Sequence, residues 1–71
     1  LGQSTEDVSR ALTSALSTGD WVELTHVDSR GRTCVDTVRI LGVHGGQVRI
    51  VQRAAAPITI PLARIHRVDS A

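Results

Sequence analysis

The stretch WVELTHVDSRGRTCVDTVRILGV, residues 21–43, decides the fold. Over residues 21–27 apolar and polar side chains alternate, which is the two-residue period of a strand with one buried face. The segment Asp-Ser-Arg-Gly at 28–31 predicts a tight turn, because Asp suits the first turn position and Gly31 is free to adopt a positive φ. Alternation resumes over 32–43. Residues 21–43 therefore predict an antiparallel β-hairpin with a long second strand.

Three shorter β segments follow this hairpin. The sequence His-Gly-Gly at 44–46 predicts a second turn, after which residues 47–53 alternate again. A fourth strand is predicted over 58–60, where the proline that follows indicates a strand end or a sheet edge. A tight turn then leads to a last short strand over 65–68. Gly42, near the end of the long second strand, predicts a bend or bulge.

A helix is predicted before the strands, over residues 4–18. Ser4 and Asp7 have the spacing of a capping box, and acidic residues in a first turn interact favourably with the helix dipole. Gly19 is a C-terminal stop signal. One apolar stripe recurs at three- and four-residue spacing: Val8, Ala11, Leu12, Ala15 and Leu16. A helix of this length is marginal alone in water, so we expect its stripe to dock on the strands.

The chain has 71 residues, of which 41% are hydrophobic, so we expect one domain over 1–71 with a small aliphatic core. The predicted fold class is mainly β with one N-terminal α-helix, about 4–18. The strands, about 20–69, have the outline of a five-stranded Sm-like small barrel of the Src-homology-3 type. Closure of such a barrel removes strand edges. Because the chain starts with Leu1 rather than Met, we expect a fragment of a longer protein.

Composition excludes several classes of protein. The single cysteine, Cys34, permits no internal disulfide, so we expect a cytoplasmic location. The sequence has neither an apolar run of about 18 residues nor a signal-peptide pattern, so no membrane segment is predicted. The net charge is +1, so any attraction for nucleic acid depends on how the arginines cluster rather than on the total charge.

Catalytic and metal-binding patterns are absent from the sequence. Cys34 could pair with His26, His44 or His66, but no local spacing supports a thiol–imidazole pair, and a strand cysteine is ordinarily a small buried hydrophobe. No Cys-x-x-Cys or His-x-x-x-His spacing provides a zinc site, and no glycine-rich phosphate loop joins a strand to a helix. We therefore expect no metal, no cofactor and no catalytic activity in this chain, which leaves open that the parent protein is an enzyme such as a helicase.

All eight Lys or Arg side chains are arginines, and they are the one group of residues in the sequence whose chemistry suggests a binding site. Guanidinium groups hold phosphates by paired hydrogen bonds. The candidates for a nucleic-acid interface are Arg30, Arg32, Arg49, Arg53 and Arg64, with Trp21 as a contact for a base. The alternative for the arginines is a solvated surface paired with Glu23, Asp36 or Asp69. The alternative for Trp21 is a core position at the junction of helix and strands.

Four short motifs carry a resemblance to a known family. They are residues 15–24 (ALSTGDWVEL), 27–32 (VDSRGR), 45–46 (GG, before a strand) and 60–65 (IPLARI). Residues 11–69 resemble the WYL-type domain, an Sm-like barrel appended to bacterial transcription regulators and found in helicase-associated proteins. The Trp-Tyr-Leu triplet that names the family corresponds here to Gln-Val-Arg at 47–49. The resemblance implies that Arg64, together with Arg32 and Arg30, contacts a nucleotide or nucleic-acid ligand.

Two functions follow as hypotheses. The first is an accessory module that binds the backbone of single-stranded DNA or RNA, with steep salt dependence and little sequence preference. The second is a protein-interaction or self-assembly module, in which copies form a homo-oligomer through edge strands such as residues 58–60. A catalytic domain would need a cluster of active-site residues that the sequence lacks.

Overall fold

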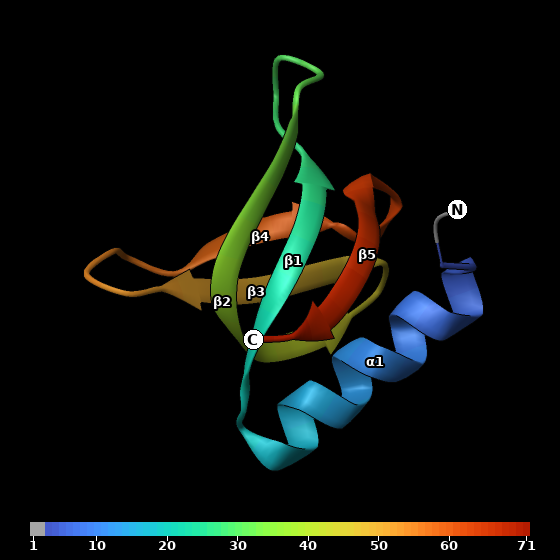
Figure 1. The fold of residues 1–71 in the computed structure, drawn as a ribbon, viewed down its shortest axis with the longest axis vertical. Coiled ribbons are helices and arrows are strands. Elements are labelled where there is room, and N and C mark those ends of the chain that lie inside the picture. The colour runs from blue at the N-terminus through green and yellow to red at the C-terminus, as the bar shows by residue number, and fades with distance from the viewer. Residues whose placement is uncertain (1–2) are drawn as a thin grey trace.

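Residues 3–71, which the computed structural model describes, form one α-helix followed by five strands (Figure 1). In chain order the elements are α1 (Thr5–Thr18), β1 (Trp21–Val27), β2 (Thr33–His44), β3 (Gln47–Gln52), β4 (Ile58–Pro61), the 3₁₀ turn η1 (Leu62–Arg64) and β5 (Ile65–Ser70). The predicted helix and strands are confirmed, and the protein is mainly β. Leu1, on which the expectation of a longer parent chain rests, lies outside the described residues.

Both ends of α1 are capped as the sequence predicts. The Ser4 hydroxyl accepts a hydrogen bond from the Asp7 backbone N–H at 3.2 Å, which satisfies one of the free donors of the first turn. At the other end Gly19 adopts φ of 74°, and its N–H donates to the Ala15 carbonyl at 2.9 Å. A left-handed residue at this position turns the chain out of the helix and into β1.

The apolar stripe of α1 is narrower than predicted. Val8, Leu12 and Ala15 are buried, and the helix contacts β2 and β5 most closely. Leu16, which the periodicity also placed in the stripe, is 39% exposed. Docking on a strongly curved sheet leaves room for one line of side chains along the helix, and Leu16 lies beside that line. No helix within residues 3–71 is long and apolar enough to cross a membrane.

The strands form one antiparallel sheet in the order β4-β3-β2-β1-β5. The predicted turn between β1 and β2 is confirmed, with Gly31 at φ of 80°. Gly45 and Gly46 both have positive φ, 54° and 77°, as the tightest hairpin turns require. The predicted irregularity at Gly42 is confirmed as a shift of the β2–β3 register between Ile40 and Gly42.

Hydrogen bonding does not close this sheet into the expected barrel. Within the described residues β4 and β5 are its two edges and do not pair with each other. The strand β4 has four residues and ends at Pro61, which has no N–H to donate, and η1 then carries the chain to the far side of β1. The outer edge of β5 is partly covered, since the Gln3 carboxamide donates to the Val68 carbonyl and accepts from the Val68 N–H, both at 3.1 Å.

The core is small and aliphatic, as the composition predicts. Its buried side chains come from α1 and from the inward positions of all five strands: Val8, Leu12, Ala15, Val22, Leu24, Val38, Ile40, Val48, Ile50, Ile60, Ile65 and Val68. His26 is the one buried polar side chain of residues 3–71, and its Nε2 lies 2.8 Å from Asp36 Oδ2. Outward positions of the same strands carry most of their polar residues, and Arg49 is one of them.

Candidate nucleic-acid interface

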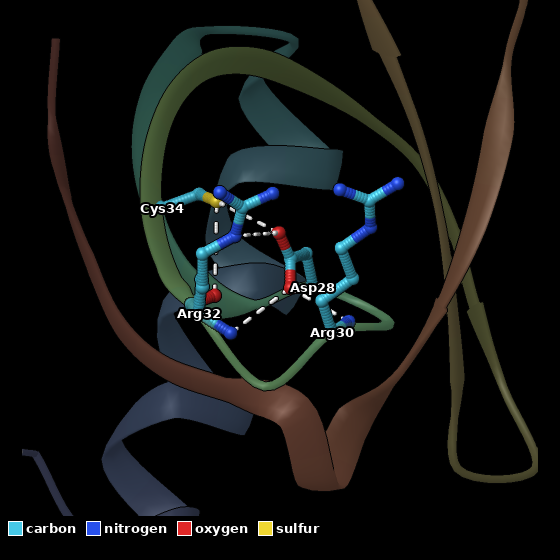
Figure 2. A network of polar contacts seen from close by, with 4 residues as sticks. All are labelled: Asp28, Arg30, Arg32 and Cys34. Atoms are coloured by element: carbon cyan, nitrogen blue, oxygen red, sulfur yellow. Dashed lines mark hydrogen bonds and ion pairs between the residues drawn. The ribbon is translucent and has the colours of Figure 1, made fainter.

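Arg30 and Arg32 lie together at the β1–β2 turn, around the carboxylate of Asp28 (Figure 2). Asp28 Oδ1 accepts the backbone N–H of Arg30 at 2.8 Å and that of Arg32 at 2.9 Å. Asp28 Oδ2 lies 3.6 Å from the Arg32 Nε. The N–H of Arg32 is the main reason why the pKa of Asp28 lies below its ordinary value, with a further contribution from the N–H of Arg30. The turn is thus built by a carboxylate that already partly neutralises Arg32.

Cys34 lies beside this turn and is not an activated thiol. Its Sγ is 3.8 Å from Asp28 Oδ2 and 3.7 Å from the Arg32 carbonyl oxygen. Desolvation raises the pKa of Cys34, and the nearby carboxylates of Asp28 and Asp36 raise it further. His26, the nearest candidate base on β1, is engaged with Asp36 instead. The geometry therefore gives no thiolate–imidazolium pair here.

Arg64 belongs to the same end of the molecule as the turn. It closes η1 and lines a hollow of about 220 Å³ between the end of β1 and β4. Asp28 and His26 line the same hollow, with the apolar side chains of Ile58 and Ile60 on the β4 side. Arg30, Arg32 and Arg64 are thus brought to one end of the sheet, with one carboxylate among them.

Arg49 lies elsewhere, on the outer face of β3, Arg53 lies in the turn that follows β3, and a third arginine joins them. Arg39 of β2 lies directly opposite Val51, which separates Arg49 from Arg53 along β3. Arg39 also lies opposite Trp21 of β1, whose ring contacts the Arg53 guanidinium, and Arg49 lies on the other side of the register shift, opposite Gly42. All three side chains are exposed, and no carboxylate within residues 3–71 forms an ion pair with any of them. Arg39, Arg49 and Arg53 are called the arginine triad below.

Trp21 lies at the edge of the arginine triad. It is opposite Arg39 in the β1–β2 register, and the guanidinium carbon of Arg53 lies 5.0 Å from the centroid of its ring. This is the distance of a cation–π contact. The ring is half-buried, so it is neither fully a core residue nor a freely exposed contact. On the other side of the site, the Arg39 guanidinium lies next to Gly19. A Cβ atom added at Gly19 would stand 3.1 Å from Nη2 of Arg39.

Charge is strongly segregated along the chain. Residues 37–68 contain five arginines and no Asp or Glu. Three of the carboxylates elsewhere have arginine partners: Asp7 with Arg10 at 3.7 Å, Asp28 with Arg32 at 3.6 Å and Asp69 with Arg67 at 2.7 Å. A fourth, Asp36, lies 2.8 Å from the His26 ring nitrogen Nε2. Glu23, on the outer face of β1, lies opposite Thr37 and diagonal to Arg39, with which it forms no ion pair among residues 3–71. The outer face of β2 and β3 is therefore a cationic surface despite the small net charge.

The six predicted contact residues fall into two groups. Arg30, Arg32 and Arg64 lie at the end of β1 that carries the turn, and Trp21 and Arg53 lie at its beginning. Six residue steps of about 3.3 Å separate the two ends of β1, or about 20 Å. Arg49 belongs to the second group by its place on β3.

Sequence reasoning missed Arg39. The signal was present, because a turn at residues 28–31 fixes the β1–β2 register and puts residue 39 opposite Trp21. The expected pairing of arginines with carboxylates holds for Asp69, whose partner is Arg67, whereas Asp36 pairs with His26. Within residues 3–71 no three His, Cys, Asp or Glu side chains are grouped as metal ligands.

Comparison of the chain with protein-family models, with curated proteins and with solved structures finds no match. The resemblance to WYL-type domains, which rests on short motifs, therefore stays a prediction.

Proposed function

We propose that this chain is a non-catalytic accessory module that binds the backbone of nucleic acid through the arginine triad. The observation that carries the proposal is the grouping of Arg39 on β2, Arg49 on β3 and Arg53 in the turn after β3, with no carboxylate ion-pair partner among residues 3–71. If their guanidinium groups were paired with acidic neighbours, these arginines would form an ordinary solvated surface. Guanidinium groups without such partners have their donors available for phosphate oxygens.

The spacing of the triad suits a chain of phosphates rather than one small anion. The backbones of Arg49 and Arg53, four residues apart, are separated by up to about 13 Å, so the three guanidinium groups can contact several phosphates of a strand. Such contacts position a backbone and read no base sequence, so we expect binding that is sequence-tolerant and weakened by salt. Arg30, Arg32 and Arg64 are left outside the primary contact, since they share their end of the sheet with Asp28, about 20 Å along β1 from Trp21.

The proposed fold family is the Sm-like small barrel within a bacterial regulator or helicase-like protein. Three features support it: the strand order β4-β3-β2-β1-β5, the irregular long strand β2, and the one-turn η1 between β4 and β5. The absence of β4–β5 pairing counts against full closure.

The proposal is tested by fluorescence anisotropy with a dye-labelled single strand of about twelve nucleotides at low salt. The wild type is compared with R39Q/R49Q/R53Q and with the control R10Q/R30Q/R64Q, which removes the same number of charges from other sites. Exposed substitutions of this kind change stability by about 0.5 kcal/mol or less. We expect the triad variant to lose about tenfold or more in affinity and the control to lose much less. Equal losses in both variants, or no binding by the wild type, would refute the proposed interface.

Self-assembly is a second candidate, and the edge strand β4 favours it. No strand pairs with the outer edge of β4 within the described residues, and Ile58 is 50% exposed there. An unpaired edge with an apolar side chain is a template for a strand of another copy. The β5 edge is less available because Gln3 bonds to Val68. Light scattering at high protein concentration decides: a monomer removes this candidate, whereas an oligomer that Ile58→Lys dissociates supports it.

A further inference from the structure

A hollow of about 670 Å³ opens between the C-terminal half of α1 and the start of β1, beside the arginine triad. Its volume lies within the usual range for ligand sites, about 300–1,000 Å³. Ala11 and Ala15 of α1 and Val22 of β1 form its apolar side, whereas Trp21 and Arg53 form the side that continues into the triad. Arg53 thus belongs both to this hollow and to the proposed phosphate-binding face.

The side formed by Trp21 and Arg53 offers a stacking surface. The two groups are already in contact, with 5.0 Å between the guanidinium carbon and the ring centroid. A half-buried ring is held in place by its surroundings, so little conformational freedom remains to be lost when a ligand stacks there. Nucleobases stack on aromatic rings and on guanidinium planes alike, and this contact tolerates any base because each has a π-face.

The rest of the lining is polar and includes two carboxylates, Asp20 and Asp69, as well as several hydroxyl groups. Ser14 of α1, Thr37 of β2 and Ser70 of β5 all line the hollow. None of these three hydroxyls forms a hydrogen bond with another residue in the part of the chain that the structure describes. A hydroxyl both donates and accepts, so these groups suit the mixed donor and acceptor edge of a base.

We propose that this hollow takes one unpaired base of a single strand whose phosphates lie on the arginine triad. The inference rests on the proposed function, because Arg53 belongs both to the triad and to the stacking surface. A nucleotide joins a phosphate to a base by one sugar, so a phosphate held at Arg53 brings its base to Trp21. Paired bases in a duplex are stacked inside the helix and do not reach the hollow. The ligand class is therefore single-stranded nucleic acid rather than duplex.

Trp21 makes the test direct, because it is the only tryptophan of the chain and it lines the hollow. Three probes are titrated at low salt: a single strand of about twelve nucleotides, an abasic strand of equal length, and the matching duplex. The abasic strand keeps the phosphates and lacks the bases. We expect the single strand to quench Trp21 and to bind about tenfold more tightly than the abasic strand, which leaves the fluorescence unchanged.

The outcomes separate the two proposals. If the single strand and the abasic strand bind equally and neither changes the fluorescence of Trp21, base capture is wrong and backbone binding stands. If none of the probes binds, both are wrong. A second variant pair guards against a loss of fold: Thr37→Val, which lines the hollow, is compared with Thr59→Val on β4, which does not. Only Thr37→Val should reduce the preference for the strand that carries bases, and an unchanged preference counts against the proposed lining.

Discussion

Replacing Leu12 by alanine tests how α1 is held on the sheet. Leu12 is fully buried in the core that also contains Leu24 and Val38. The substitution removes three carbons, each worth about 0.8 kcal/mol of burial. The cavity left behind adds to this, so we expect a loss of about 3–4 kcal/mol. A domain of this size is stable by about 4–10 kcal/mol in total. The melting temperature should therefore fall by about 15–25 °C.

The matched control is Leu16→Ala, one turn further along the same helix and 39% exposed. Both variants make the same chemical change and gain the same helix propensity, so their difference isolates burial on the sheet. Urea unfolding followed by the fluorescence of Trp21 and by circular dichroism measures both. We expect Leu16→Ala to cost less than about 1 kcal/mol. Equal costs for the two substitutions would refute the docking of α1 described above.

Three further predictions concern the edge of the sheet, the first turn and the helix end. Gln3→Ala removes two hydrogen bonds to β5, and urea unfolding should show a loss of about 1–2 kcal/mol; no loss would mean that the edge contact is unimportant. The pKa of Asp28 is lowered in the folded state, chiefly by the N–H of Arg32. The stability that Asp28 contributes is therefore fully present above its ordinary pKa of 3.8, and it is lost as the pH falls through the lower pKa of the folded state. Asp28→Asn should flatten that acid-side decline in thermal melts, and an unchanged decline would contradict the assignment. Gly19→Ala forces a side chain to φ of 74° and toward Arg39, so its unfolding free energy should drop by about 1–2 kcal/mol, and wild-type stability would contradict the strained C-cap.

The elements themselves were predictable because their signals are local. Ser4 and Gly19 bound the helix, and alternation marks the strands. Gly31 and the pair at 45–46 satisfy a backbone conformation that other residues rarely adopt. The register of β1 with β2 follows from the length of the first turn alone. Each of these features depends on a few neighbouring residues, and all of them except the register were predicted.

The predictions that differed depend on packing between distant segments. Leu16 has the periodicity of a core residue, yet the curvature of the sheet decides which side of the helix is covered. Closure of the sheet depends on whether β4 reaches β5, which no local pattern encodes. The predicted contact residues fall into two groups for the same reason. Arg30 follows the end of β1, whereas Arg53 contacts Trp21 at the beginning of β1. Arg39 was missed because its neighbours on the face come from two other strands.

The salt dependence of single-strand binding tests the central claim most directly. For single strands the logarithm of the binding constant falls with the logarithm of the salt concentration by about 0.7 for each phosphate neutralised. Three contacts at the arginine triad predict a slope of about −2 for the wild type and for R10Q/R30Q/R64Q. For R39Q/R49Q/R53Q the slope should approach zero. A triad variant that keeps the wild-type slope would show that phosphates are held elsewhere and would contradict the account.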